Sequence, residues 1–143
     1  MGRYIFTILI AFSLLLSVLS GCGKTRDYVQ ATLNREFTLA VGETASIDEE
    51  GLLFTFRDVP DDSRCPKDVQ CVWPGIASCM VDVTGNSTKS SIVLVQPGGT
   101  KSEAYEFQDY IITFALKPYP ESITPIEKSE YSLTMTVRKA GGG

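Results

Sequence analysis

Hydrophobic residues recur at every second position along much of this chain, and this period constrains the fold more than any other feature of the sequence. The clearest case is the run 131–138, in which Leu133, Met135 and Val137 alternate with polar residues. A period of two places one face of a strand in a core and the other face in water. The same pattern predicts further strands at 36–41, 45–47, 52–57, 76–83, 92–94 and 110–117.

The segments between these runs, such as 84–87 and 96–100, are rich in glycine, proline, serine and asparagine, which favour turns. From position 36 onward no stretch sustains a helical period. About seven strands without crossover helices predict an all-β fold, an antiparallel β-sandwich, with a small closed β-barrel as the alternative. We expect a single domain at 35–140, which is long enough to bury its own core.

The first 21 residues differ from the rest of the chain. Arg3 precedes an almost unbroken apolar run from Tyr4 to Leu19, which is the pattern of an export signal. A membrane span is the weaker interpretation, because the run is slightly short and no stop-transfer pattern follows it. Residues 22–34 show no sustained period, so we expect them to form a tether to the domain.

The end of this signal, Leu19-Ser20-Gly21-Cys22, resembles the lipobox of bacterial lipoproteins. The resemblance implies that the signal is cut before Cys22 and that this cysteine carries acyl chains. Each buried CH₂ contributes about 0.8 kcal/mol, so several chains anchor a protein to a membrane. Gly23 stands where an aspartate would signal inner-membrane retention. The resemblance therefore implies the outer membrane in a diderm host and the outer face of the cell membrane otherwise; an ordinary secreted protein is the alternative.

The exported chain is acidic. Removing Arg3 from the 13 Lys and Arg residues leaves 12, against 17 Asp and Glu residues, for a formal net charge of −5. Such a chain, without a basic run, does not suit nucleic acid or docking on anionic lipid. We therefore expect membrane contact through the lipid anchor alone.

The stretch 61–75 is the most distinctive part of the domain, because it holds two of the four cysteines and the only tryptophan. Cysteines in an exported protein tend to pair, and Cys22, if lipidated, leaves three for pairing. We favour a disulfide between Cys65 and Cys71, because the short, proline-stiffened loop can bring their Cα atoms within about 6 Å. Cys79, on the apolar face of a strand, is then a buried thiol.

Metal sites are alternative interpretations of the same region. Three cysteines could bind zinc, but without a histidine or a fourth thiol the site would need a carboxylate. The carboxylates near the loop could bind calcium; they are Asp58, Asp61, Asp62 and Asp68. Turn chemistry, in which Asp and Ser side chains bond nearby amides, explains residues 60–63 better. We therefore predict no metal and no cofactor, and we expect Arg64 to pair with one of these carboxylates.

The aromatic residues have two interpretations. Trp73 is either an exposed recognition group or a plug that seals one end of the sandwich, and its large area in a small domain favours the plug. The alternation places Tyr110 and Tyr131 inward. The candidate binding loop carries four residues: Asp61, Asp62, Arg64 and Trp73.

The motif Asp62-Ser63-Arg64-Cys65-Pro66, followed by Cys71-Val72-Trp73-Pro74-Gly75, resembles one found in small, uncharacterised bacterial lipoproteins and secreted domains. The segment 116–120 and the tyrosine at 131 are similar to that family as well. Cys79 departs from the pattern, which has an aliphatic residue there. The resemblance implies no activity, because no function is established for the family.

The chain contains no histidine, which removes the usual general base and the usual activator of a serine or cysteine nucleophile. We therefore expect a non-enzymatic cell-envelope lipoprotein, a binding or structural module that presents its disulfide-closed loop to a protein, peptide or glycan. The alternative is an enzyme acting on envelope glycans, with Asp61, Asp62 or Asp68 as acid and base; this needs two carboxyl groups about 5–9 Å apart.

Overall fold

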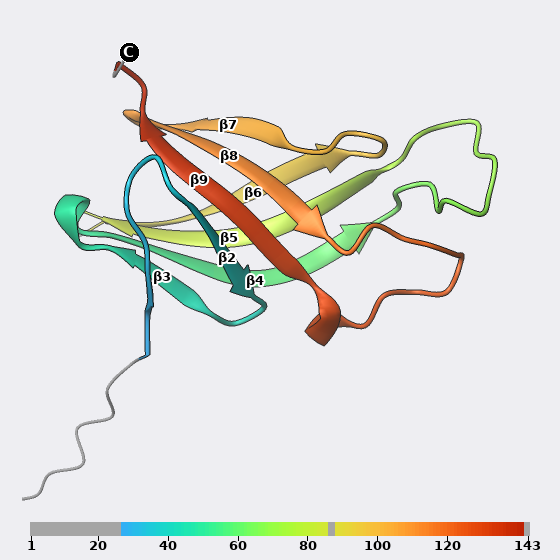
Figure 1. Cartoon of the computed structure of the whole chain (residues 1–143), viewed down its shortest axis with the longest axis horizontal. Coiled ribbons are helices and arrows are strands. Elements are labelled where there is room, and N and C mark those ends of the chain that lie inside the picture. The colour runs from blue at the N-terminus through green and yellow to red at the C-terminus, as the bar shows by residue number, and fades with distance from the viewer. Residues whose placement is uncertain (1–26, 86–87, 142–143) are drawn as a thin grey trace, which may run out of the picture.

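The computed structural model describes residues 27–85 and 88–141, which form two sheets packed as a sandwich (Figure 1). The first sheet has the order β1 (Val29–Gln30), β3 (Thr44–Ile47), β4 (Leu52–Asp62), β5 (Ile76–Gly85) and β6 (Thr88–Pro97). The second has the order β2 (Glu36–Ala40), β9 (Ser132–Lys139), β8 (Tyr110–Lys117) and β7 (Glu103–Phe107). Two short 3₁₀ turns, η2 (Asp48–Glu50) and η3 (Lys128–Glu130), precede β4 and β9. The predicted β-sandwich is confirmed, and the closed barrel is wrong for this part of the chain.

Two strands of the structure were not predicted from the sequence. β7 was missed because its residues are alternately half-buried and exposed, so its period carries little hydrophobic contrast. β1 lies inside the predicted tether and pairs in parallel with β3, through Val29 with Ala45. Ala31, just after it, is buried. The tether prediction is therefore wrong for residues 29–31, since a strand of two residues is too short to show a period.

The core lies between the sheets and follows the predicted alternation. Phe37 of β2 and Phe54 of β4 meet across the sandwich with ring centroids 6.5 Å apart, and each buried phenylalanine contributes about 1.5–3 kcal/mol relative to exposure. Tyr131 is buried as predicted. Tyr110 is half-buried against the core, and its hydroxyl donates to Glu50 at 2.7 Å, so it lies inward only in part.

The longest strand, β4, delivers the chain to the cysteine loop. It runs five residues beyond the predicted end at Arg57 and pairs with β5 as far as Asp62, with register shifts on either side of Asp58. Residues 60–62 therefore lie in an irregular strand and not in the predicted turn, because bulges accommodate Pro60. The predicted bonds from these side chains to backbone amides are present, since Asp62 accepts from the Arg64 amide and Ser63 from the Ile76 amide, both at 3.3 Å. The loop 63–75 projects from this end of the sandwich, beside the connection between β8 and β9 (Figure 1).

Among the residues that the structure describes, no helix has the length and apolar character needed to cross a membrane. The predicted export signal at 1–21 and the predicted lipidation site Cys22 lie outside the described residues.

Candidate binding site

The cysteine loop is closed as predicted. Cys65 and Cys71 form a disulfide with their Cα atoms 5.9 Å apart. Cys79 is a free, buried thiol, and burial raises its pKa to about 12, so it carries no charge. The disulfide removes two of the thiolates that a zinc site would need. Within 27–85 and 88–141, no three Cys, Asp or Glu side chains gather as a metal site would require.

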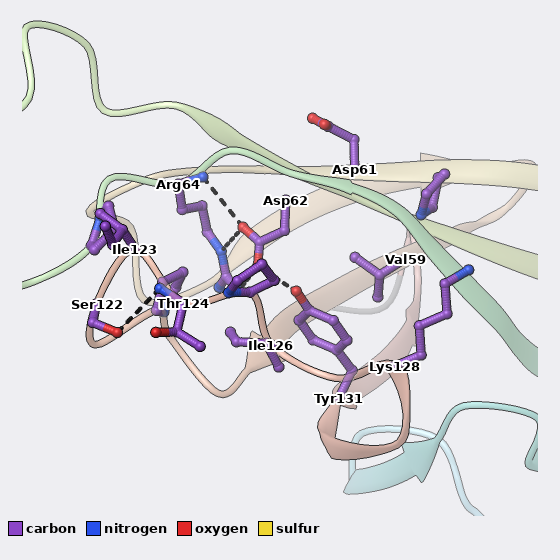
Figure 2. A pocket seen from close by; sticks show the side chains of 14 residues that line it. Val59, Asp61, Asp62, Arg64, Ser122, Ile123, Thr124, Ile126, Lys128 and Tyr131 are labelled. Atoms are coloured by element: carbon purple, nitrogen blue, oxygen red, sulfur yellow. Dashed lines mark hydrogen bonds and ion pairs between the residues drawn. The ribbon is translucent and has the colours of Figure 1, made fainter.

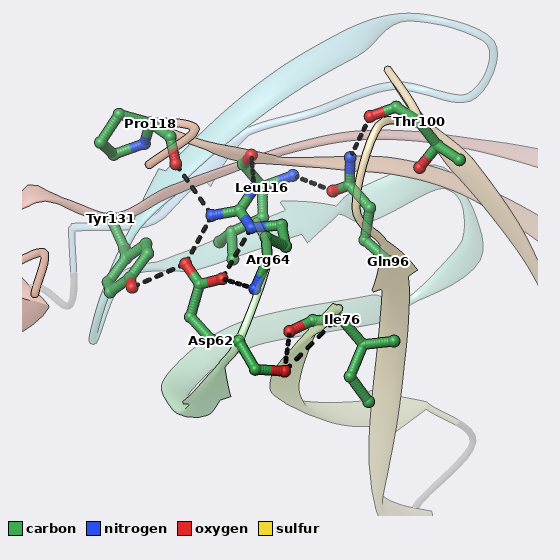
Figure 3. Close-up of polar contacts among 9 residues, drawn as sticks. Asp62, Arg64, Ile76, Gln96, Thr100, Leu116, Pro118 and Tyr131 are labelled. Atoms are coloured by element: carbon green, nitrogen blue, oxygen red, sulfur yellow. Dashed lines mark hydrogen bonds and ion pairs between the residues drawn. The ribbon is translucent and has the colours of Figure 1, made fainter. Parts of the chain in front are cut away.

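Asp62 and Arg64 form a buried ion pair at the base of the loop (Figure 3). The Arg64 Nη2 and Nε atoms donate to the two Asp62 carboxylate oxygens at 2.6 and 2.8 Å. The Arg64 side chain is 0% exposed and the Asp62 side chain is 7% exposed. The predicted pairing of Arg64 with a carboxylate is confirmed, but both groups are enclosed and therefore cannot present charge to a partner.

The same guanidinium connects the two sheets. Arg64 follows β4 in the first sheet, and it donates to the carbonyl of Leu116 in the second sheet at 3.1 Å and to that of Pro118 at 2.9 Å. It also lies 5.1 Å from the centroid of the Tyr119 ring, within range of a cation–π contact. These bonds satisfy a planar donor group that would otherwise be costly to bury, and they fix the base of the loop to the end of β8.

Tyr131 completes this buried network. Its hydroxyl donates to Asp62 at 2.9 Å, and Figure 3 shows it approaching the carboxylate from the side opposite Arg64. Burial by itself would raise the pKa of Asp62, but the hydrogen bonds from Arg64 and Tyr131 outweigh it and lower that pKa. Burial and the Asp62 bond raise the pKa of Tyr131. Asp62 is therefore an ionised structural group, which does not suit the role of general acid.

Gln96 forms a second polar link between the sheets that the sequence interpretation did not include. It is buried on β6, accepts a hydrogen bond from the Leu116 amide at 2.7 Å and donates to the Thr100 carbonyl at 3.0 Å. A signal was present, because Gln96 continues the inward series of Ile92 and Leu94. A polar residue on a core face indicates a buried partner.

The tip of the loop is exposed, and the predicted plug role of Trp73 is wrong. Trp73 is 79% exposed and Val72 beside it is 87% exposed. The end of the sandwich is occupied by Arg64 and its partners instead. A tryptophan and a valine held in water together are unusual on a small domain, since burial of either side chain would be favourable.

Backbone hydrogen bonds tie the residues that flank the tip to each other and to neighbouring segments. The Cys65 amide donates to the Pro74 carbonyl at 2.9 Å, and the Gly98 amide donates to the Gly75 carbonyl at 2.8 Å. The Lys67 amide donates to Pro120 at 3.1 Å, which ties the loop to the β8–β9 connection. A shallow depression of about 440 Å³ lies beside Trp73, between the disulfide and the turn at Gly98.

The predicted carboxylate cluster is dispersed. Asp58 pairs with Lys128 at 2.7 Å, whereas Asp62 is enclosed by Arg64. Figure 2 shows the carboxyl groups of Asp61 and Asp62 pointing away from each other, as neighbouring strand residues do. Asp61 is left on the rim of a cleft of about 340 Å³ between the end of β4 and the segment 120–128. Asp68 is exposed on the loop, so the structure does not assemble the calcium site.

Of the four candidate binding residues, the structure therefore leaves Trp73 and Asp61 accessible and encloses Asp62 and Arg64. Val72, which was not among the candidates, joins Trp73 at the tip. No protein-family model, no curated protein and no solved structure matches this chain.

Proposed function

We propose that this protein is a non-enzymatic binding module of the bacterial cell envelope, which uses the tip of its disulfide-closed loop to hold a protein, peptide or glycan. The observation that carries the proposal is the exposure of Val72 and Trp73 on a loop whose base is buried and cross-linked. A tryptophan on a rigid support loses little conformational entropy on binding, and tryptophan is enriched at the energetic centres of interfaces. Acyl chains on Cys22 would hold the protein at the membrane. This membrane is the outer membrane in a diderm host and otherwise the cell membrane, on its outer face.

Replacing Trp73 by serine is expected to weaken binding of the partner at least about tenfold, because a tryptophan at the centre of an interface contributes about 2 kcal/mol or more. The full-length protein, purified from membranes, is used to capture partners from the native envelope. The captured molecule is identified by mass spectrometry and then titrated against the wild-type and variant proteins.

The matched control is Ile123→Ser. Ile123 is 81% exposed and lies outside the loop, on the rim of the cleft beside Asp61. Its replacement should leave the affinity unchanged, and both variants should unfold at the wild-type temperature, since neither side chain is buried. An equal loss for the two variants, or full affinity after Trp73→Ser, would contradict a role for the loop tip.

Replacing Cys22 by serine is expected to move the protein from the membrane fraction to the soluble exported fraction, because the acylated cysteine would be the attachment. Cys79→Ala is the control, since it alters a cysteine that takes no part in the anchor. Fractionation followed by intact mass measurement decides the result. A Cys22→Ser protein that stays uncleaved in the membrane would show that residues 4–19 act as a span.

A further inference from the structure

The two sheets formed by residues 27–85 and 88–141 have four edge strands, and three of them are protected against pairing with another chain. β1 has only two residues and β2 only five. β7 also has five residues and carries Glu103 and Glu106. Short length and charge are the usual means by which a sheet edge avoids association, because an open edge offers unpaired backbone groups to any extended strand.

The fourth edge, β6, is long, and its one charged residue, Lys89, lies near its beginning. It is ten residues long and pairs with β5 over its whole length without a register shift, from Ile76 with Pro97 to Gly85 with Thr88. β5 is its only strand neighbour within the described part of the chain. From Ser90 to Gln96 it contains no charged residue, so the backbone donors and acceptors on the side of β6 away from β5 form an uncharged row with no strand partner among the described residues.

The outer face of β6 is apolar as well. Val93 and Val95 are 47% and 43% exposed, and Val93 lies opposite Met80 of β5 on the same face. The inward residues Ile92 and Leu94 are buried. A strand added beside β6 would cover the exposed valines and satisfy the outward backbone groups in one step.

We propose that β6 is a self-association edge, along which two copies of this chain pair in antiparallel orientation about a two-fold axis. The occupant best suited to this edge is an extended strand with one edge free, an uncharged stretch and β-branched residues that cover Val93 and Val95. Among the described strands of this chain, β6 itself is the one with these properties, and two-fold symmetry supplies the same edge from the second copy.

The distribution of charge fixes the register. The uncharged segment from Ser90 to Gln96 pairs completely with itself when the axis passes beside Val93. In that register Val93 faces Val93 of the second copy, Ser91 faces Val95, and Lys89 faces Pro97. The lysines therefore stay apart, and no like charges lie directly opposite each other.

The experiment uses the full chain, exported by the producing cells and purified in detergent. Sedimentation should give the mass of a dimer that dissociates on dilution. Val93→Lys should raise the dimer dissociation constant at least about tenfold, because it places two ammonium groups face to face. Val93→Thr, which keeps the branched shape, should retain the dimer. Because Val93 is 47% exposed, both substitutions should leave the fold intact.

A cysteine scan tests the register on the same protein. With Cys65 and Cys71 bridged and Cys79 buried, a Val93→Cys variant gains one accessible thiol and should be cross-linked to a dimer by a short thiol-specific reagent. Ala104→Cys on the β7 edge should not be cross-linked under the same treatment. A monomeric mass at every concentration, a dimer that does not cross-link through Val93→Cys, or cross-linking only to a different protein would overturn the proposal.

Discussion

Replacing Arg64 by methionine is expected to cost about 3–5 kcal/mol of the free energy of unfolding, the usual loss when one partner of a buried ion pair is removed. Methionine fills much of the volume but donates no hydrogen bond. The Asp62 carboxylate then keeps Tyr131 as its remaining side-chain donor, and the carbonyls of Leu116 and Pro118 lose the Arg64 bonds. Urea unfolding of the purified protein, followed by tyrosine and tryptophan fluorescence, measures the change.

Arg57→Met is the matched control for this prediction. Arg57 pairs with Asp82 at 3.2 Å, but its side chain is half-exposed, and Lys89 also reaches Asp82 at 3.1 Å. An exposed pair contributes at most about 1 kcal/mol, so this variant should unfold close to the wild-type midpoint. If the two variants cost the same, the Arg64 network does not hold the sheets together as its geometry indicates.

Replacing Gly75 by alanine is expected to cost about 3 kcal/mol or more, since a backbone clash adds to an unfavourable left-handed conformation. Gly75 has φ +68°, and a β-carbon there would lie 1.8 Å from the carbonyl oxygen of Ser63. The chain must shift at the point where Gly75 accepts a bond from the Gly98 amide. The variant should therefore lose both stability and partner binding, although it leaves Trp73 in place.

Gly51→Ala separates the two causes. Gly51 has nearly the same conformation, φ +61°, but nothing lies within 4 Å of a β-carbon built on it. Its replacement carries only the cost of the left-handed conformation, about 1–2 kcal/mol. Thermal and urea unfolding of both variants, measured beside the partner titration, give the comparison. Equal costs for the two glycines would show that the close approach of Gly75 to the Ser63 carbonyl contributes nothing.

The sequence by itself determined the class of fold and the closure of the loop. The alternation at 131–138 predicts a strand because a period of two leaves a segment only one way to bury its apolar side. It therefore identified Leu133, Met135 and Val137 as core residues. The pairing of Cys65 with Cys71 was predictable for a similar reason, because a short loop brings its own ends together.

The tertiary structure alone decided the roles of Arg64 and Trp73. A single charged residue in a loop has no period, and its burial depends on the carbonyls at 116 and 118, more than fifty positions away. Once Arg64 and Tyr131 occupy the end of the sandwich, Trp73 has no place there, and the Pro74–Gly75 turn leaves it in water. Whether an individual side chain is buried depends on which distant residues fill the same space in the closely packed interior. The residues next to it in the sequence do not reveal this.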